Sequence, residues 1–226
     1  MANLFEEPKF IVVEGPIRVG KSSLAKALAT QLHARHIAEP EHNPFLERFY
    51  RGAPSMAFPA QMWFLKERHE QMLALGREQE AKVAGAWHGP VIADYLFEKD
   101  KLFAYVNLTD AELDLYNRYY QMLRHDVPRP DLVIYLQASS EVLKQRLKRK
   151  GVTQERALSD DYIHQVVEAY EHFFFHYSGS DLLVVDTTQL DFVHRNQDLQ
   201  LLLKRLSAPI KGTQYFLPLG AEDAAS

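Results

Sequence analysis

The sequence of 226 residues has no cysteine, no long apolar run and no excess of positive charge. Without cysteine, disulfides, thiolate catalysis and cysteine-ligated zinc are excluded. No apolar run approaches the roughly 18 residues that a membrane span needs. The first residues are polar and acidic, unlike the basic segment that opens a secretory signal. A formal charge of −4 argues against nucleic acid or an anionic membrane as the main partner. We therefore expect a cytoplasmic protein that acts on small molecules.

Short apolar runs alternate along the chain with stretches of helical periodicity, and 46% of the residues are apolar. Five strands are predicted, over residues 10–14, 36–39, 91–94, 132–136 and 182–185. Helices are predicted over residues 20–33, 43–50, 55–84, 97–107, 109–125, 140–150, 159–177 and 189–206. This alternation predicts one α/β domain over residues 1–226, with a parallel sheet of about five strands flanked by helices. Residues from about 208 to 226 show no periodicity and are expected to form a loose tail.

A phosphate-binding motif follows the first predicted strand. It has the pattern G-x-x-x-x-G-K-[ST] and leads into the helix predicted over residues 20–33. The residues predicted to bind the nucleotide here are Gly15, Pro16, Ile17, Arg18, Val19, Gly20, Lys21, Ser22 and the following Ser23. The glycines let successive backbone N–H groups face inward around phosphate oxygens, and the helix dipole adds to the attraction. Lys21 would neutralise the terminal phosphates, and the Ser22 hydroxyl would bind Mg²⁺. The motif predicts binding of a nucleoside triphosphate.

Acidic residues stand at or just after four of the predicted strands: Glu14, Glu39, Asp94 and Asp186. In a parallel sheet, ligands gather at the carboxyl ends of the strands. A phosphoryl-transfer enzyme needs one acid to orient the attacking hydroxyl and accept its proton, and another to help hold Mg²⁺. Glu39 and Asp94 are the candidates. The alternative for each is a solvated carboxylate at a strand end, or a helix cap.

A basic cluster follows the fourth predicted strand by one helix. It lies around a glycine turn and consists of Lys144, Arg146, Lys148, Arg149, Lys150 and Arg156. A charge run of this kind is usually a solvated helix face. Phosphoryl-transfer enzymes, however, place at this point a lid whose cations neutralise developing charge and exclude water. We predict such a lid over residues 148–158.

With these residues placed, the chain resembles the deoxyribonucleoside kinase family, and in particular its bacterial deoxyadenosine/deoxyguanosine kinase branch. The resemblance runs from the first strand to about Phe175. Besides the P-loop with its preceding Val13-Glu14, it rests on Glu39-Pro40, the motif N-P-[FY]-L-x-x-[FY]-Y at residues 43–50, Gln61 with residues 62–65, residues 91–95, residues 130–136, and Gly151 with Glu155. It implies a P-loop kinase fold with a lid, and a homodimer.

The resemblance also implies an activity, the ATP-dependent 5′-phosphorylation of deoxyribonucleosides, with a purine base preferred. Glu39 would be the general base for the 5′-hydroxyl, and Ser22 and Asp94 would hold Mg²⁺. Gln61 would hydrogen-bond the nucleobase and Phe103 would stack against it. The sugar 3′-hydroxyl would be held by Tyr50 and Glu155, and the donor phosphates would be contacted by Arg146 and Lys150.

Several positions depart from the family pattern. Arg18 replaces a small residue of the P-loop, and Val152 replaces the second arginine of the lid. Tyr95 lies at the substrate side where the family has an arginine that positions the base carboxylate. The loss of these two arginines implies either slower catalysis or compensation by Arg18, Arg149 or Arg156. Glu39 is one residue nearer Asn43 than the pattern expects, so that Glu41 is a rival base. Two other functions stay open: a nucleoside monophosphate kinase similar to thymidylate kinase, and a nucleotide-binding scaffold without activity.

Overall fold

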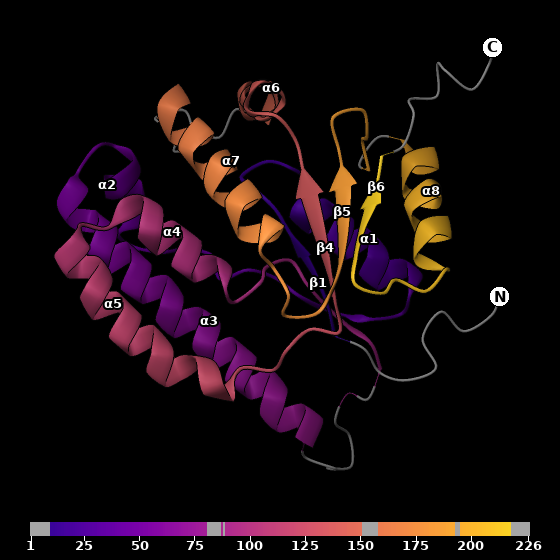
Figure 1. The fold of residues 1–226 in the computed structure, drawn as a ribbon, viewed down its shortest axis with the longest axis horizontal. Coiled ribbons are helices and arrows are strands. Elements are labelled where there is room, and N and C mark those ends of the chain that lie inside the picture. The colour runs from indigo at the N-terminus through magenta and orange to yellow at the C-terminus, as the bar shows by residue number, and fades with distance from the viewer. Residues whose placement is uncertain (1–9, 81–86, 88, 151–157, 193–194, 218–226) are drawn as a thin grey trace.

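A six-stranded parallel sheet forms the centre of the computed structural model, which describes residues 10–80, 87, 89–150, 158–192 and 195–217 (Figure 1). The strand order is β2-β3-β1-β4-β5-β6, and every neighbouring pair is parallel. The strands are β1 (Phe10–Glu14), β2 (Arg35–Ile37), β3 (Val91–Ala93), β4 (Leu132–Gln137), β5 (Asp181–Asp186) and β6 (Thr213–Phe216). The parallel α/β fold predicted from the alternating elements is thus confirmed.

Helices cover both faces of the sheet. They are α1 (Lys21–Gln31), α2 (Leu46–Tyr50), α3 (Ala57–Glu80), α4 (Lys99–Asn107), α5 (Asp110–Leu123), α6 (Ser140–Lys150), α7 (Asp160–Phe175) and α8 (Asn196–Leu206), with short 3₁₀ turns at Pro54–Met56 and Arg124–Asp126. Figure 1 shows α3, α4, α5 and α7 on one side of the sheet, and α1 and α8 on the other. Both faces are therefore shielded from water, which accounts for the near-continuous apolar runs of the central strands.

The alternation of side chains along β1 shows how the two hydrophobic cores arise. Ile11 and Val13 face the core that contains Leu24 and Leu28 of α1, whereas Phe10 and Val12 face the opposite core with α3, α4 and α5. All five residues of β1 are buried. Because β1 lies between β3 and β4, the segments that follow these three strands meet at one edge of the sheet.

The sixth strand corrects the expectation of a loose tail. Thr213–Phe216 pairs in parallel with β5, with Val184 opposite Tyr215, although its side chains alternate only between exposed and half-buried. A strand of four residues at the edge of a sheet buries too little apolar surface to leave a periodic pattern in the sequence. The last helix also begins later than predicted, at Asn196 instead of residue 189. Among the described residues, none of the helices has both the length and the apolar character that crossing a membrane requires.

Candidate active site

The P-loop follows β1 and leads directly into α1. Gly15 has a φ of 152°, and a Cβ atom at this position would lie 2.4 Å from the carbonyl oxygen of Leu136, so only glycine fits against the end of β4. Gly20, with a φ of 114°, forms the N-cap of α1. The positive end of the α1 dipole therefore faces the loop, the arrangement that favours phosphate.

Lys21 is the first residue of α1 and turns its ammonium group back over the loop. Its Nζ donates to the carbonyl oxygens of Gly15 at 2.7 Å and Pro16 at 3.1 Å. Burial, and then the positive charge of Lys99, lower the pKa of Lys21 to about 8, against the opposing effect of nearby carboxylates. Its neighbour Ser22 is exposed, so that its hydroxyl is open to a ligand.

Two cavities meet at the P-loop. The first, of about 520 Å³, is lined by many of the residues predicted for the substrate and catalysis: Glu39, Tyr50, Gln61, Asp94 and Phe103. The second, of about 950 Å³, is lined by residues 17–23 together with Arg146, Arg149 and Asp191. Lys21, Ser22 and Glu39 line both. The first cavity has the size of a small-molecule site, and the second one is the side on which the P-loop can hold phosphates.

Glu39 stands two residues after β2 and is held by groups from three other elements. Its backbone N–H donates to Asp94 Oδ1 at 2.5 Å. Its carboxylate Oε1 accepts from Arg68 Nη2 at 2.5 Å and from Lys99 Nζ at 2.8 Å. Burial favours the protonated acid, but Lys99 and then Arg68 more than offset this effect and hold the pKa of Glu39 below its usual range. Glu39 is therefore an ionised, oriented carboxylate at neutral pH.

Glu41, the rival base, also lines the first cavity, but its side chain is exposed. It additionally borders a shallow groove beside Trp63. Of the two acids, Glu39 is the one that cations orient and the one that reaches both cavities.

Asp94 follows β3 and is 2% exposed. Besides its bond to Glu39, its Oδ2 lies 3.7 Å from Nε2 of His36. It lines the first cavity together with Ser22, so a carboxylate and a hydroxyl are both available there as oxygen ligands. Among the described residues, no group of three or more histidine, aspartate and glutamate side chains is arranged to hold a metal. Mg²⁺ in nucleotide sites is bound through one or two carboxylates plus phosphate oxygens, so the residues present fit a metal that arrives with the nucleotide.

The sequence analysis missed a network of buried charges beneath the first cavity. Arg68 of α3 is 3% exposed and pairs with Glu39 and with Asp100 of α4, which is fully buried. Asp100 also accepts hydrogen bonds from the Gln61 amide and, at 2.9 Å, from the Tyr116 hydroxyl. One signal for Arg68 was present in the sequence: it lies in the apolar helical stripe of Leu65, Met72 and Leu75, where a charge must be paired.

The predicted substrate residues differ in how they are placed. Gln61 is buried, and its Nε2 donates to the Asp100 backbone carbonyl at 2.9 Å as well as to the carboxylate. Phe103 and Tyr50 are half-buried and line the first cavity. Tyr95, by contrast, is completely buried in the core, where its hydroxyl donates to Gln71 Oε1 at 2.5 Å. The structure therefore brings Gln61, Phe103 and Tyr50 together with Glu39 and keeps Tyr95 behind them.

The basic cluster is described only in part. Arg146 donates to the carbonyl oxygens of Val19 at 3.1 Å, Thr187 at 2.5 Å and Leu190 at 3.3 Å, and so ties the P-loop to the segment after β5. It borders the second cavity, on the predicted donor side. The rest of the predicted lid, with Gly151, Val152, Glu155 and Arg156, lies outside the described residues, as does the side chain of Lys150.

A parallel α/β sheet, a P-loop at the end of its central strand and an ionised acid facing that loop together define a P-loop enzyme of phosphoryl transfer. The sequence pattern of the deoxynucleoside kinase family matches residues 11–211. The chain belongs to this family and is a deoxynucleoside kinase.

Named relatives and solved structures agree with this assignment. The chain is 32% identical to a deoxyguanosine kinase of Bacillus subtilis over 207 residues, which covers 89% of this chain and 96% of the relative. It is 26% identical to a deoxyadenosine kinase of Lactobacillus acidophilus, again with 89% and 96% covered. A structure of deoxyadenosine kinase from M. mycoides has a TM-score of 0.72 at 23% identity and covers 87% of this chain and 98% of its own. That structure supports the fold.

Proposed function

We propose that this enzyme transfers the γ-phosphoryl group of Mg-ATP to the 5′-hydroxyl of a deoxyribonucleoside, with a purine base preferred. The observation that carries the proposal is the position of Glu39, an ionised carboxylate at the junction of a P-loop cavity and a cavity of nucleoside size. A nucleophilic hydroxyl and a terminal phosphate held in the two cavities would meet at this carboxylate. Positioning of this kind supplies most of the catalysis in phosphoryl transfer.

In the proposed reaction, Glu39 accepts the proton of the 5′-hydroxyl as the 5′-oxygen forms its bond to the γ-phosphorus. The bond between that phosphorus and the bridging oxygen breaks, and ADP leaves. Lys21 and the N-terminus of α1 balance the negative charge on the phosphate oxygens. Ser22 and Asp94 would hold Mg²⁺, which when bound supplies positive charge against the phosphates.

Recognition of the nucleoside is assigned to the first cavity. Both hydrogens of the Gln61 amide are directed at Asp100, so its carbonyl oxygen is left to accept a hydrogen bond from the base. Phe103 supplies an aromatic face for stacking, and Tyr50 a group for the sugar. The preference for a purine is supported by the names of the relatives, which include deoxyguanosine and deoxyadenosine kinases.

A matched pair of variants tests the assignment of the base. ADP release is measured with Mg-ATP and a panel of deoxyribonucleosides for the wild type, Glu39→Gln and Glu41→Gln. Loss of a general base should lower kcat by about 10²–10⁴-fold in Glu39→Gln, while Glu41→Gln retains nearly full turnover, because the Glu41 side chain is exposed. If Glu41→Gln is the inactive variant, the base has been assigned to the wrong acid.

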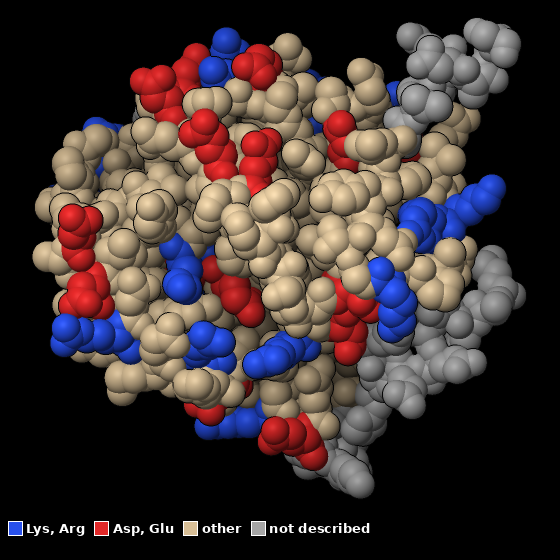
Figure 2. Space-filling view, in the orientation of Figure 1, with Lys and Arg blue, Asp and Glu red and all other residues tan. Residues whose placement is uncertain are grey.

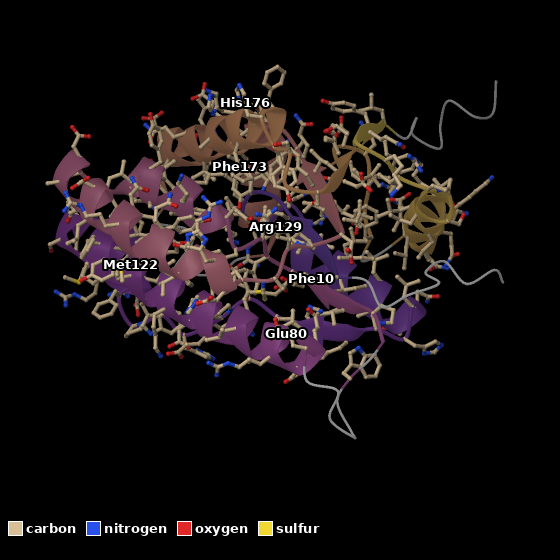
Figure 3. The ribbon with its side chains drawn as sticks, turned by 60° about the horizontal axis from the view of Figure 1, so that its bottom comes forward. Phe10, Glu80, Met122, Arg129, Phe173 and His176 are labelled. Carbon is tan, nitrogen blue, oxygen red and sulfur yellow. The ribbon has the colours of Figure 1, made fainter. Side chains whose placement is uncertain are left out.

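The proposal includes a homodimer in the cytoplasm. Leu115, Tyr119 and Met122 are exposed along one face of α5, and Tyr105 of α4 is 76% exposed (Met122 is labelled in Figure 3). A second copy would cover such apolar side chains. Light scattering should give twice the chain mass of 26.1 kDa, and Met122→Glu should reduce it whereas Leu201→Glu on the exposed part of α8 should not. A wild-type mass of 26.1 kDa would contradict the dimer.

A further inference from the structure

Glu39 is oriented by cations that differ from those the sequence suggested. The expected arginine is replaced by Tyr95, whose hydroxyl bonds to Gln71. The two cations that contact Glu39 among the described residues are instead Arg68 and Lys99. Arg68 also pairs with Asp100, and this ion pair joins α3 to α4.

Lys99 is placed differently, because it joins the two sides of the site. It is the first residue of α4, is 3% exposed, and its Nζ lies 2.8 Å from Glu39 Oε1 and 3.8 Å from Glu14 Oε1. Glu14 is fixed in turn, because its carboxylate accepts from the backbone N–H of Gly15 at 2.7 Å and of Leu96 at 2.7 Å. The ammonium group of Lys99 thus spans a carboxylate bound to the P-loop and the proposed base.

The contacts to Glu39 also distinguish its two oxygens. Arg68 and Lys99 both bind Oε1. This arrangement anchors one oxygen of the carboxylate and leaves Oε2 as the oxygen that can accept the proton of a hydroxyl in the first cavity. When one oxygen of a carboxylate base is held by cations, the other oxygen is kept in position to accept a proton. The cations then lower the reaction barrier without taking part in the chemistry themselves.

We propose that Lys99 is the positioning residue for Glu39 and does the work of the arginine that Tyr95 replaces. This inference rests on the proposed function, since it takes Glu39 to be the base. Lys99 is expected to act on the reacting hydroxyl only through Glu39. Its removal should therefore lower kcat and leave the KM for the nucleoside almost unchanged.

The test is a double-mutant cycle between Lys99 and Glu39. We expect Lys99→Met to lower kcat by about 10²-fold, the cost of a misplaced catalytic group, with less than about a threefold change in KM. Lys99→Arg retains the charge and should recover most of the rate. In the Glu39→Gln background, Lys99→Met should change kcat by less than about threefold, because the group it positions is gone. Lys101→Met on the exposed side of the same helix is the matched control and should behave as wild type.

Each result is decisive. An equal cost of Lys99→Met in both backgrounds, or an unchanged kcat, would overturn the positioning role. If Glu39→Gln itself keeps its turnover, the proposed function fails instead, whatever Lys99→Met does. Thermal unfolding is measured on every variant. Should Lys99→Met fail to fold, Lys99→Arg decides: near wild-type kcat supports the role of the charge, and a loss as large as that of Glu39→Gln contradicts it.

Discussion

Replacement of Arg68 by methionine should destabilise the fold severely, because it leaves a buried charge without its partner. Arg68 is 3% exposed and Asp100 is completely buried. After the substitution, Asp100 keeps, among the described residues, only the neutral donors of Gln61 and Tyr116, whereas Glu39 is partly exposed and keeps Lys99. We therefore assign the cost to Asp100 alone. Removal of one partner from a buried ion pair costs about 3–5 kcal/mol.

Equilibrium unfolding in urea at pH 7, followed by circular dichroism, measures this change. A thermal scan should show a Tm lower by about 6–20 °C, at about 2–4 °C per kcal/mol for a domain of this size. Arg118→Met is the control, because Arg118 pairs with Asp114 at the surface with side-chain exposures of 75% and 66%. It should change stability by less than about 1 kcal/mol. Arg68→Met with Asp100→Asn should recover part of the loss. A change under about 1 kcal/mol for Arg68→Met would refute the reasoning.

Two further predictions concern substrate binding. Gln61→Leu removes the carbonyl acceptor for the base and should lower kcat/KM by a factor of about 5–150, mainly through a higher KM. This factor corresponds to a loss of about 1–3 kcal/mol. Unchanged kinetics and base preference would make Gln61 a purely structural residue. The pKa of Lys21, which burial and then Lys99 lower to about 8, predicts that the affinity of the free enzyme for Mg-ATP falls as the pH rises through 8, because the ammonium charge is lost. Lys21→Ala should bind weakly at pH 7 without this dependence and lose several powers of ten in kcat, and a wild-type affinity that stays constant to pH 10 would contradict the assignment.

The sequence predicts the strand, loop and helix of the P-loop because this arrangement is local. One strand, one loop and one helix supply the P-loop; Gly15 is required by the close approach of Leu136 and Val19, and Gly20 is favoured by its φ of 114°. The acids after β2 and β3 were found for a related reason. Parallel strands bring their carboxyl ends to one edge, so that Glu39 and Asp94 come within hydrogen-bonding distance although 55 residues separate them.

The network behind the first cavity depends on contacts that no local pattern encodes. Arg68 and Asp100 are 32 residues apart, and their pairing depends on how α3 packs against α4. Lys99 gave even less of a signal, because the first residue of a helix is usually solvated. The family pattern at Tyr95 points to the place of a missing cation, but not to the residue that replaces it. Such substitutions become visible only when the side chains are placed in space.

The described residues on the face seen in Figure 2 carry no comparable charge signal for the site. On the face seen in Figure 2, acidic and basic side chains are interspersed over the described residues. The charges around the site instead form a chain of Glu14, Lys99, Glu39, Arg68 and Asp100, in which the sign alternates and all but the partly exposed Glu39 are buried. Apart from Lys21 of the P-loop, the lysine and arginine side chains that line the first cavity, Lys99 and Arg68, are thus each paired with a carboxylate.

That neutralisation leads to the most direct test of the central claim, that the acceptor is a nucleoside. A nucleoside monophosphate would need cations left over for its phosphate, but Arg68 and Lys99 are both engaged by carboxylates, and the ionised Glu39 would repel it. The measurement is the rate of phosphorylation of deoxyadenosine and deoxyguanosine against their 5′-monophosphates and thymidylate, at equal concentrations with Mg-ATP. The account predicts faster turnover of the two nucleosides, and faster turnover of any monophosphate would contradict it.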